Sequence, residues 1–94
     1  MTALTIGHVS FPYRGRWATA RLDENLCWAC DAPEAVPMLT EASGLSGEER
    51  FGVSRAVMRR RGRHAMYRLA SRMGGSVTLA TAESTQLGLR FAEA

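Results

Sequence analysis

Alternating apolar and polar residues in the first third of the chain predict three β-strands. The first strand is Leu4–Phe11, and its apolar positions change parity near Gly7–His8, which indicates a β-bulge there. Pro12–Gly15 is typical of a turn, and the second and third strands follow at Arg16–Leu22 and Leu26–Cys30. We expect the second and third strands to form a hairpin.

A short helix is predicted after the third strand. Asp31 and Glu34 have the spacing of a capping box, in which the first side chain caps the helix and the second reaches back to it. Pro37 removes one helical N–H group, so we expect this helix to be short or kinked and to end near Ser43. The glycines of Gly44–Gly47 then break the helical pattern.

The pattern of residues 48–73 predicts a long helix, and Ser46 and Glu49 form a second capping-box pattern at its start. Gly62 lies on the apolar side, where it either permits close packing or divides the helix in two. Gly74–Gly75 is a C-terminal stop signal. The apolar side groups residues within about 100° of one another on a helical wheel: Phe51, Met58, Ala65, Met66, Leu69 and Met73.

Strand patterns return at the end of the chain. Ser76–Ala82 and Gln86–Phe91 alternate apolar and polar residues, and we expect them to form a hairpin. The resulting order, β-β-β-α-α-β-β, is typical of an α+β fold: a small antiparallel sheet covered on one face by one short and one long helix. The predicted core contains Ile6, Val9, Phe11, Trp17, Leu22, Trp28, Leu39, Phe51, Met58, Leu69, Val77, Leu79, Leu87, Leu89 and Phe91.

The 94 residues have the length of a single domain, covering residues 1–94. The share of apolar residues, 46%, is enough for a core and excludes a disordered chain. No stretch approaches the ~18 apolar residues of a membrane span, and the first residues lack the basic segment of a signal peptide. We therefore expect a cytoplasmic protein without membrane contact. The free edges of the terminal hairpins also permit a homodimer.

Charge is unevenly distributed along the chain. Residues 1–49 carry three arginines and seven acidic residues, residues 50–72 carry eight arginines and no acidic residue, and residues 73–94 carry one arginine and two acidic residues. The net charge of +3 therefore conceals a strongly basic central block. Every cationic side chain is an arginine, which is explained either by codon bias, as in GC-rich bacteria and their phages, or by selection for guanidinium groups that bind phosphate and carboxylate.

The basic block lies on the long predicted helix and flanks its apolar side. No acidic residue occurs between residues 50 and 82, so the repulsion among these arginines requires acids elsewhere in the chain or an anionic partner. A solvated helix side, whose arginine stems cover the core edges, is the alternative interpretation. The candidate anion-binding side carries Arg59, Arg60, Arg63, His64 and Tyr67, and a second flank carries Arg61, Arg68 and Arg72.

An anionic partner fits this predicted surface. Nucleic acid is the first hypothesis, because arginines neutralise phosphates and release counterions, and Tyr67 can stack on a base or pack on a sugar. The alternative is an adaptor or inhibitor that binds an acidic protein surface, since arginine-rich surfaces also form protein–protein hot spots. Both hypotheses describe a small binding or regulatory protein rather than an enzyme.

Two segments resemble known families in the order of their elements. Met38–Ser46, the long helix and the C-terminal hairpin resemble a winged helix-turn-helix, whose second helix enters the major groove; Arg50 and Pro37 depart from that pattern. His64–Phe91 resembles the last helix and hairpin of histidine-kinase-type ATPase domains, in which a helix ends in a Gly pair before two strands. The second resemblance implies a packing arrangement only. The nucleotide-binding Asn, Asp and Gly motifs of that family have no counterpart upstream, so we expect no ATP.

Cys27 and Cys30 form a C-x-x-C pair, a pattern found in redox and zinc sites. A redox cysteine needs a helix N-terminus, whereas Cys27 falls in a predicted strand, where residues three apart point to opposite faces. With His8 and His64 the pair supplies four potential zinc ligands, but their spacing matches no zinc finger. No nucleophile–base pair or phosphate-binding loop is evident. The sequence therefore predicts no metal, no cofactor and no enzyme activity.

Overall fold

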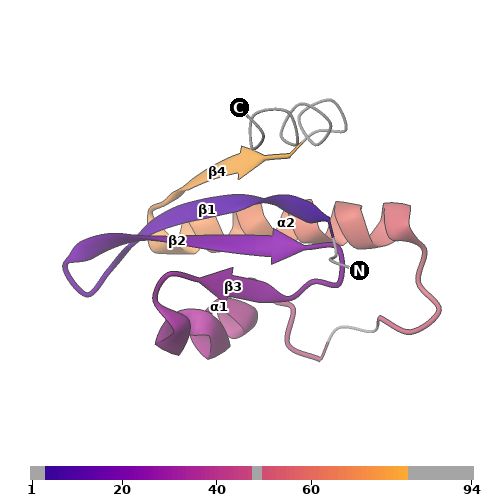
Figure 1. The fold of residues 1–94 in the computed structure, drawn as a ribbon, viewed down its shortest axis with the longest axis horizontal. Coiled ribbons are helices and arrows are strands. Elements are labelled where there is room, and N and C mark those ends of the chain that lie inside the picture. Colours follow the sequence, from indigo (N-terminus) through magenta and orange to yellow (C-terminus); the bar gives the residue numbers. More distant parts are fainter. Residues whose placement is uncertain (1–3, 48–49, 81–94) are drawn as a thin grey trace.

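The structure, a computed structural model, describes residues 4–47 and 50–80. Figure 1 shows their arrangement. The elements, in chain order, are β1 (Thr5–Tyr13), β2 (Arg16–Asp23), β3 (Trp28–Cys30), the 3-10 turn η1 (Pro33–Ala35), α1 (Val36–Ala42), α2 (Arg55–Met73) and β4 (Ser76–Leu79). The predicted order is confirmed as far as these residues reach. The last predicted strand, Gln86–Phe91, lies outside them.

The four strands form one antiparallel sheet in the order β3-β2-β1-β4. β1 and β2 pair along almost their whole length, and β4 pairs with β1 from Gly7 to Ser10, so the chain returns to its first strand after two helices. The predicted bulge is present one residue earlier than expected, because the β1–β2 register shifts between Thr5 and Gly7. The shift explains why Ile6 and Gly7, although adjacent, are both buried.

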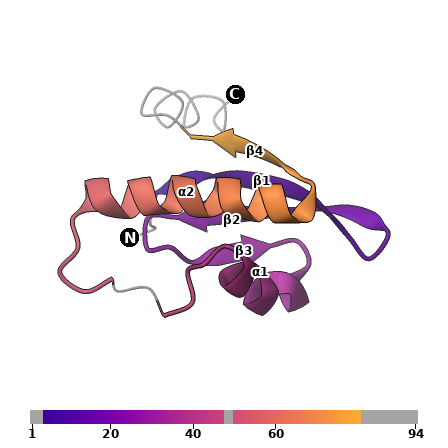
Figure 2. The same ribbon diagram turned by 180° about the vertical axis from the view of Figure 1, so that it is seen from behind.

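Helix α2 covers one face of the sheet, and α1 lies beside it near β3 (Figures 1 and 2). Alternate residues of the central strands point into the space below α2, which makes a core between the two layers. No helix among residues 4–47 and 50–80 covers the other face. This arrangement is the predicted α+β fold, with one short and one long helix on one face of an antiparallel sheet.

Most of the predicted core is confirmed. Val77 and Leu79 are half-buried, and Leu87, Leu89 and Phe91 lie outside the described residues. The residues found buried as predicted are Ile6, Val9, Phe11, Leu22, Trp28, Leu39, Met58 and Leu69.

Two of the predicted core residues are exposed. Trp17 pairs with Pro12 and is 65% exposed, because it alternates with the inward-facing Ala18 and therefore points to the uncovered face of the sheet. Phe51 is 94% exposed because it precedes α2, where the helical wheel that grouped it with the core does not apply.

The start of the long helix was predicted too early. α2 begins at Arg55, with Ser54 as its N-cap: the Ser54 hydroxyl accepts a hydrogen bond from the Val57 N–H at 3.3 Å. Gly52 has φ of +74°, a left-handed conformation that a right-handed helix cannot contain. The Ser46–Glu49 pattern therefore does not start the helix. Its predicted end is confirmed, since Gly74 is the C-cap.

The predicted capping box of the short helix is also wrong. The helical segment begins at Pro33 with Ala32 as N-cap and no side-chain cap, while the Asp31 carboxylate accepts the Thr19 N–H at 3.1 Å. Asp31 thus extends the β2–β3 pairing. The predicted end near Ser43 is confirmed, because Ser43 is the C-cap of α1.

Turns between strands are tighter than predicted. β1 continues through Pro12 to Tyr13, so the β1–β2 turn consists of Arg14 and Gly15 alone. Both have positive φ, as a two-residue type I′ turn requires. The third strand starts only at Trp28, since Leu26 also has positive φ.

Gly62 permits close packing and does not divide α2, which is continuous from Arg55 to Met73. A Cβ at Gly62 would overlap the Ile6 side chain and lie 3.3 Å from side-chain atoms of both Leu22 and Leu26. The helix therefore approaches the sheet at the one position where its apolar side has no side chain.

We predict that Gly62→Ala destabilises the protein. Alanine gains about 0.5–1 kcal/mol of helix propensity, but overpacking a filled core costs about 1–3 kcal/mol. The net effect is a loss on the order of 1 kcal/mol, measured by urea unfolding. Ser71→Ala on the exposed side of α2 is the control and should leave stability unchanged or slightly raised. An equally stable Gly62→Ala variant would contradict close packing.

Candidate anion-binding face

The eight predicted anion-binding side chains all lie on α2. The structure separates seven of them by what they contact, and the eighth, Arg61, lines a pocket beside the loop after α1. One group pairs with an acid, a second binds backbone carbonyls, and a third points into solvent. Of these groups, only the third has neither an acidic partner nor a carbonyl contact among residues 4–47 and 50–80.

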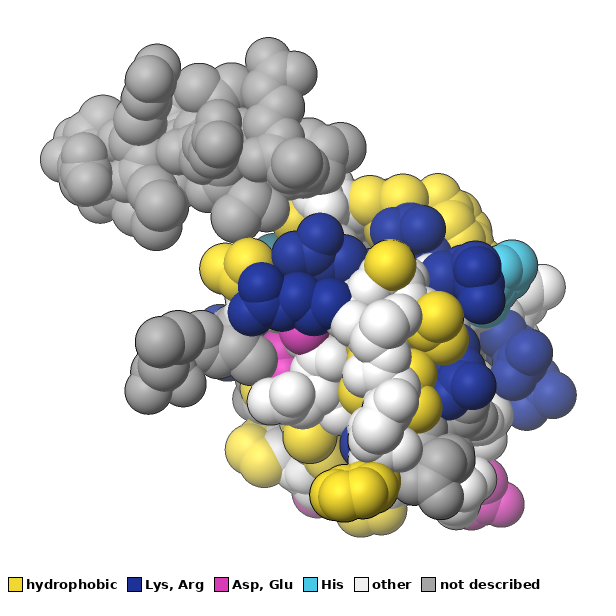
Figure 3. Space-filling view, turned by 90° about the vertical axis from the view of Figure 1, so that its right-hand side faces the viewer, with side chains coloured by type: hydrophobic (Ala, Val, Ile, Leu, Met, Phe, Trp, Pro, Cys, Tyr) yellow, Lys and Arg dark blue, Asp and Glu magenta, His cyan; other side chains and the backbone are white. Residues whose placement is uncertain are grey.

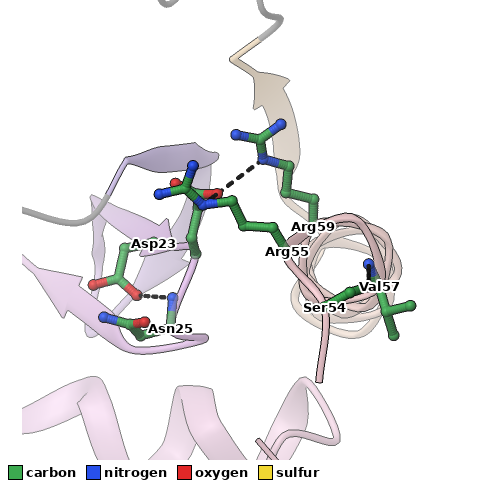
Figure 4. Close-up of polar contacts among 7 residues, drawn as sticks. Asp23, Asn25, Ser54, Arg55, Val57 and Arg59 are labelled. Atoms are coloured by element: carbon green, nitrogen blue, oxygen red, sulfur yellow. Dashed lines mark hydrogen bonds and ion pairs between the residues drawn. The ribbon is translucent and has the colours of Figure 1, made fainter. Parts of the chain in front are cut away.

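A buried carboxylate holds the first group. Glu24 is 7% exposed, and its Oε2 lies 3.0 Å from Nε of Arg59 and 3.3 Å from Nε of Arg55. Figure 4 shows the two guanidinium groups converging on one carboxylate from successive turns of α2. Arg59 therefore neutralises an acid of its own chain, as does Arg55.

The turn after β2 fixes the position of Glu24. Its N–H donates to the Leu4 carbonyl at 2.9 Å. The Asp23 carboxylate accepts the N–H group of Asn25 at 2.9 Å (Figure 4). It also accepts the N–H group of Cys27 at 3.1 Å, and these bonds make an Asx turn. This turn places the Glu24 carboxylate beside Arg55 and Arg59 on the first two turns of α2.

Arginines of the second group donate hydrogen bonds to backbone carbonyl groups of neighbouring loops. Arg68 donates to the Ser43 carbonyl at 3.2 Å and Arg72 to the Ala42 carbonyl at 2.9 Å, which satisfies carbonyl groups at the end of α1. Arg50, before α2, donates from Nε to the Asn25 carbonyl at 2.9 Å and from Nη2 to the Leu26 carbonyl at 3.1 Å. These guanidinium groups remain charged, but some of their N–H donors are already bound to carbonyl groups of the same chain.

The third group consists of Arg60, Arg63, His64 and Tyr67. Their spacing of three, four and seven residues places them on one side of α2, and all four are exposed. Within residues 4–47 and 50–80 none of them makes an ion pair or a hydrogen bond. We call these four residues the α2 basic face.

A shallow pocket of about 160 Å³ adjoins the α2 basic face. It is lined by Arg61, His64 and Arg68 from α2 and by residues 43–45 of the loop after α1. Arg68 crosses Gly44, where a Cβ would overlap its guanidinium group. Two residues of the second predicted flank, Arg61 and Arg68, therefore border this pocket, and Arg68 and Arg72 bind carbonyl groups of the fold.

Figure 3 views the end of the molecule where α2 begins. Arginine side chains gather on two sides of this end. One group touches an acidic side chain, and the other lies beside a histidine. The charge of the basic block is therefore spread around the helix rather than concentrated on one side.

One exposed basic set was missed by the sequence analysis. Arg14 and Arg16 at the β1–β2 turn are exposed, next to the exposed Trp17. The sequence pattern predicts Trp17 in the core and Pro12–Gly15 as a turn, and neither prediction indicates an exposed basic set. The alternation of buried Ala18, Ala20 and Leu22 in the second strand was the signal that could have placed Trp17 on the opposite face.

The cysteines make no disulfide. Cys27 is exposed; Cys30 is half-buried, and its Sγ accepts the Ala32 N–H at 3.4 Å and donates to Asp31 Oδ1 at 3.6 Å. Burial is the main cause that raises the pKa of the Cys30 thiol, so the thiolate needed for redox or metal chemistry is disfavoured. In the described part of the chain, no three His, Cys, Asp or Glu residues gather as metal ligands.

The chain matches no known protein-family model, and comparisons with curated proteins and with solved structures find no significant similarity. Of the helices in residues 4–47 and 50–80, none has the length and apolar character needed to cross a membrane.

We predict that Glu24→Gln lowers the free energy of unfolding by about 1 kcal/mol. A hydrogen bond to a charged group contributes about 1.5–3 kcal/mol, and the exposure of both arginines, 42% for Arg59 and 72% for Arg55, reduces that figure. Urea unfolding measures the change. Glu34→Gln, at an exposed carboxylate, is the matched control with no expected effect. Equal stability of both variants would show that Glu24 does not hold α2.

We predict that iodoacetamide alkylates Cys27 before Cys30 in the folded protein. Cys27 is exposed, whereas the raised pKa of Cys30 leaves less thiolate at any pH below it, and burial limits access. Peptide mass spectrometry at neutral and mildly alkaline pH gives the order. Urea-unfolded protein is the control, in which the two rates should converge. Faster labelling of Cys30 in the folded state would contradict the described environment.

Proposed function

We propose that this is a non-enzymatic nucleic-acid-binding protein that docks phosphate groups on the α2 basic face. The proposal depends on one observation: Arg60 and Arg63 are exposed on the same side of α2 and have no acidic partner in the part of the chain that the structure describes. The interface is narrower than the sequence predicted, because Glu24 takes Arg59.

Electrostatics favours an anionic partner at this face. Arg60 and Arg63 are three residues apart and repel each other. Within the described residues, the acid that forms ion pairs with α2 is Glu24, and its partners are two other arginines, Arg55 and Arg59. A phosphate backbone relieves this repulsion and releases its own counterions. Each guanidinium offers a planar set of donors that matches two phosphate oxygens.

The other members of the face suit a nucleic acid. Tyr67 is 55% exposed and lies one turn after Arg63, so its ring can pack on a sugar or a base near a bound phosphate. His64 adds a donor at the same height of the helix, beside the pocket with Arg61 and Arg68. Together these side chains form a row of cationic and aromatic groups along one helix.

The salt dependence of binding tests this proposal. Fluorescence anisotropy with labelled oligonucleotides should give binding that weakens steeply with salt, and Arg60→Ala or Arg63→Ala should each reduce the slope of log K against log salt by about 0.7–0.9. Both side chains are exposed, so the melting temperature should not change.

Arg55→Ala is the matched control. It removes the same charge from the same helix, but from a guanidinium that already has a carboxylate partner, so its effect on the slope should be smaller. If Arg55→Ala and Arg60→Ala lowered the salt slope equally, binding would depend only on the net charge of the protein, and this result would contradict a defined binding face. Absence of binding to any oligonucleotide at low salt would reject nucleic acid, and a partner that persists at high salt would favour the acidic-protein alternative.

A further inference from the structure

The β1–β2 hairpin extends beyond the rest of the sheet. β1 and β2 pair as far as Tyr13 and Arg16, whereas β4 reaches only Ser10 on β1 and β3 reaches only Ala20 on β2. Residues 12–17 therefore form a two-stranded projection, which we call the arm. In both ribbon views it extends past the C-terminal end of α2 (Figures 1 and 2).

The arm is basic and aromatic. Arg14, Arg16 and Trp17 are exposed, and the Arg14 guanidinium lies over the Tyr13 ring, 5.3 Å from its centroid. The chain has no acidic residue before Asp23, and neither Arg14 nor Arg16 has an ion pair within residues 4–47 and 50–80. The arm thus presents two cations that no acid of the described residues neutralises.

Arg14 occupies an unfavourable backbone position. Its φ of +50° lies in the left-handed region of the backbone map. This conformation is unfavourable for L-residues and is common only for Gly and, to a lesser degree, Asn and Asp. A type I′ turn favours Asn, Asp or Gly at this position. Arg14 is held there against its backbone preference, and within residues 4–47 and 50–80 its guanidinium lies over the Tyr13 ring and has no acidic partner. A strained residue at an exposed tip is typical of a functional position.

The two sides of the arm carry different groups. By alternation, Tyr13 and Arg16 lie on the side of the sheet that α2 covers, with buried Phe11 and Ala18, while Trp17 and Pro12 lie on the uncovered side. A ligand that contacts α2, the arm cations and Trp17 must therefore bend from one side of the two-stranded arm to the other. A single strand can do so, whereas a duplex is stiff over about 150 base pairs.

We propose that the arm binds single-stranded nucleic acid, with Arg14 and Arg16 on phosphates and the Trp17 ring stacked on an unpaired base. This inference rests on the proposed function and names its substrate class. A strand that follows the α2 basic face toward the C-terminal end of the helix arrives at the arm (Figure 2). Aromatic rings next to cations suit unpaired bases, because every base has a face on which a ring can stack.

Tryptophan fluorescence reports directly on the arm. The second tryptophan, Trp28, is buried, and its Nε1 donates to Ser43 Oγ at 3.1 Å. Titration with unlabelled oligothymidylate should therefore quench Trp17, and a duplex of the same length should bind more weakly with little quenching. Trp17→Ala should weaken binding of the single strand by roughly tenfold, and Trp17→Phe should retain part of the affinity.

Paired charge variants test the phosphate contacts. The double variant Arg14→Ala, Arg16→Ala should reduce the slope of log K against log salt by about 1.4 for a single strand. The matched double variant Arg14→Lys, Arg16→Lys should keep most of the wild-type slope. Both positions are exposed, so we expect both double variants to fold, and circular dichroism checks this.

The outcomes separate the arm from the α2 basic face. Normal binding, slope and quenching in the arm variants, with defects only in Arg60→Ala and Arg63→Ala, would overturn the arm proposal and leave the proposed function standing. Duplex binding with equal affinity and quenching would overturn the single-strand assignment, as would a Trp17 response to anionic lipid vesicles but not to oligonucleotides. Wild-type protein that binds no oligonucleotide would reject both proposals.

Discussion

The close approach of α2 to the sheet at Gly62 determines which charges the molecule can offer to a partner. The Ile6, Leu22 and Leu26 side chains fill the space that a side chain at position 62 would occupy, so the helix cannot rotate without losing this contact. With that rotation fixed, Met58, Met66 and Leu69 enter the core. Residues 60, 63, 64 and 67 are then directed to solvent by helical geometry alone.

The arginines of α2 show why net charge predicts a binding surface only in outline. Two of them converge on Glu24, and others bind carbonyl oxygens at the end of α1. Guanidinium groups serve well in both roles, because they carry several donors and a long apolar stem. A basic block in a sequence therefore combines structural and available cations, and only the geometry separates them.

The periodic parts of the fold were predictable from the sequence, and the irregular parts were not. Strand alternation located Val9 and Phe11 in the core, and the stop signal at Gly74 ended the long helix as expected. Phe51 was misplaced because the backbone of Gly52 interrupts the helix, and a positive φ leaves no periodic signal.

The candidate-site residues also divide into those that a periodic pattern predicts and those that depend on irregular structure. The α2 basic face could be derived from spacing, since residues three and four apart share one side of a helix. The pairing of Arg59 with Glu24 could not, because it joins residues 35 positions apart through a turn whose shape depends on hydrogen bonds of Asp23. The hydrophobic character of Trp17 predicts a core position, whereas the parity of its strand, with Ala18, Ala20 and Leu22 buried, places it on the opposite side of the sheet.

Charge segregation along the chain gives the arm and the α2 basic face a common origin. All acidic residues before the basic block occur between Asp23 and Glu49, and Glu24 directs its charge to the start of α2. The strands before Asp23 therefore keep their cations unneutralised by any local acid, as does the solvent side of α2. Because β1 and β2 lie under α2 and their hairpin continues past its C-terminal end, the α2 basic face and the arm follow one another along the molecule, although they are far apart in sequence. A partner attracted to one set by long-range electrostatics is thus brought close to the other.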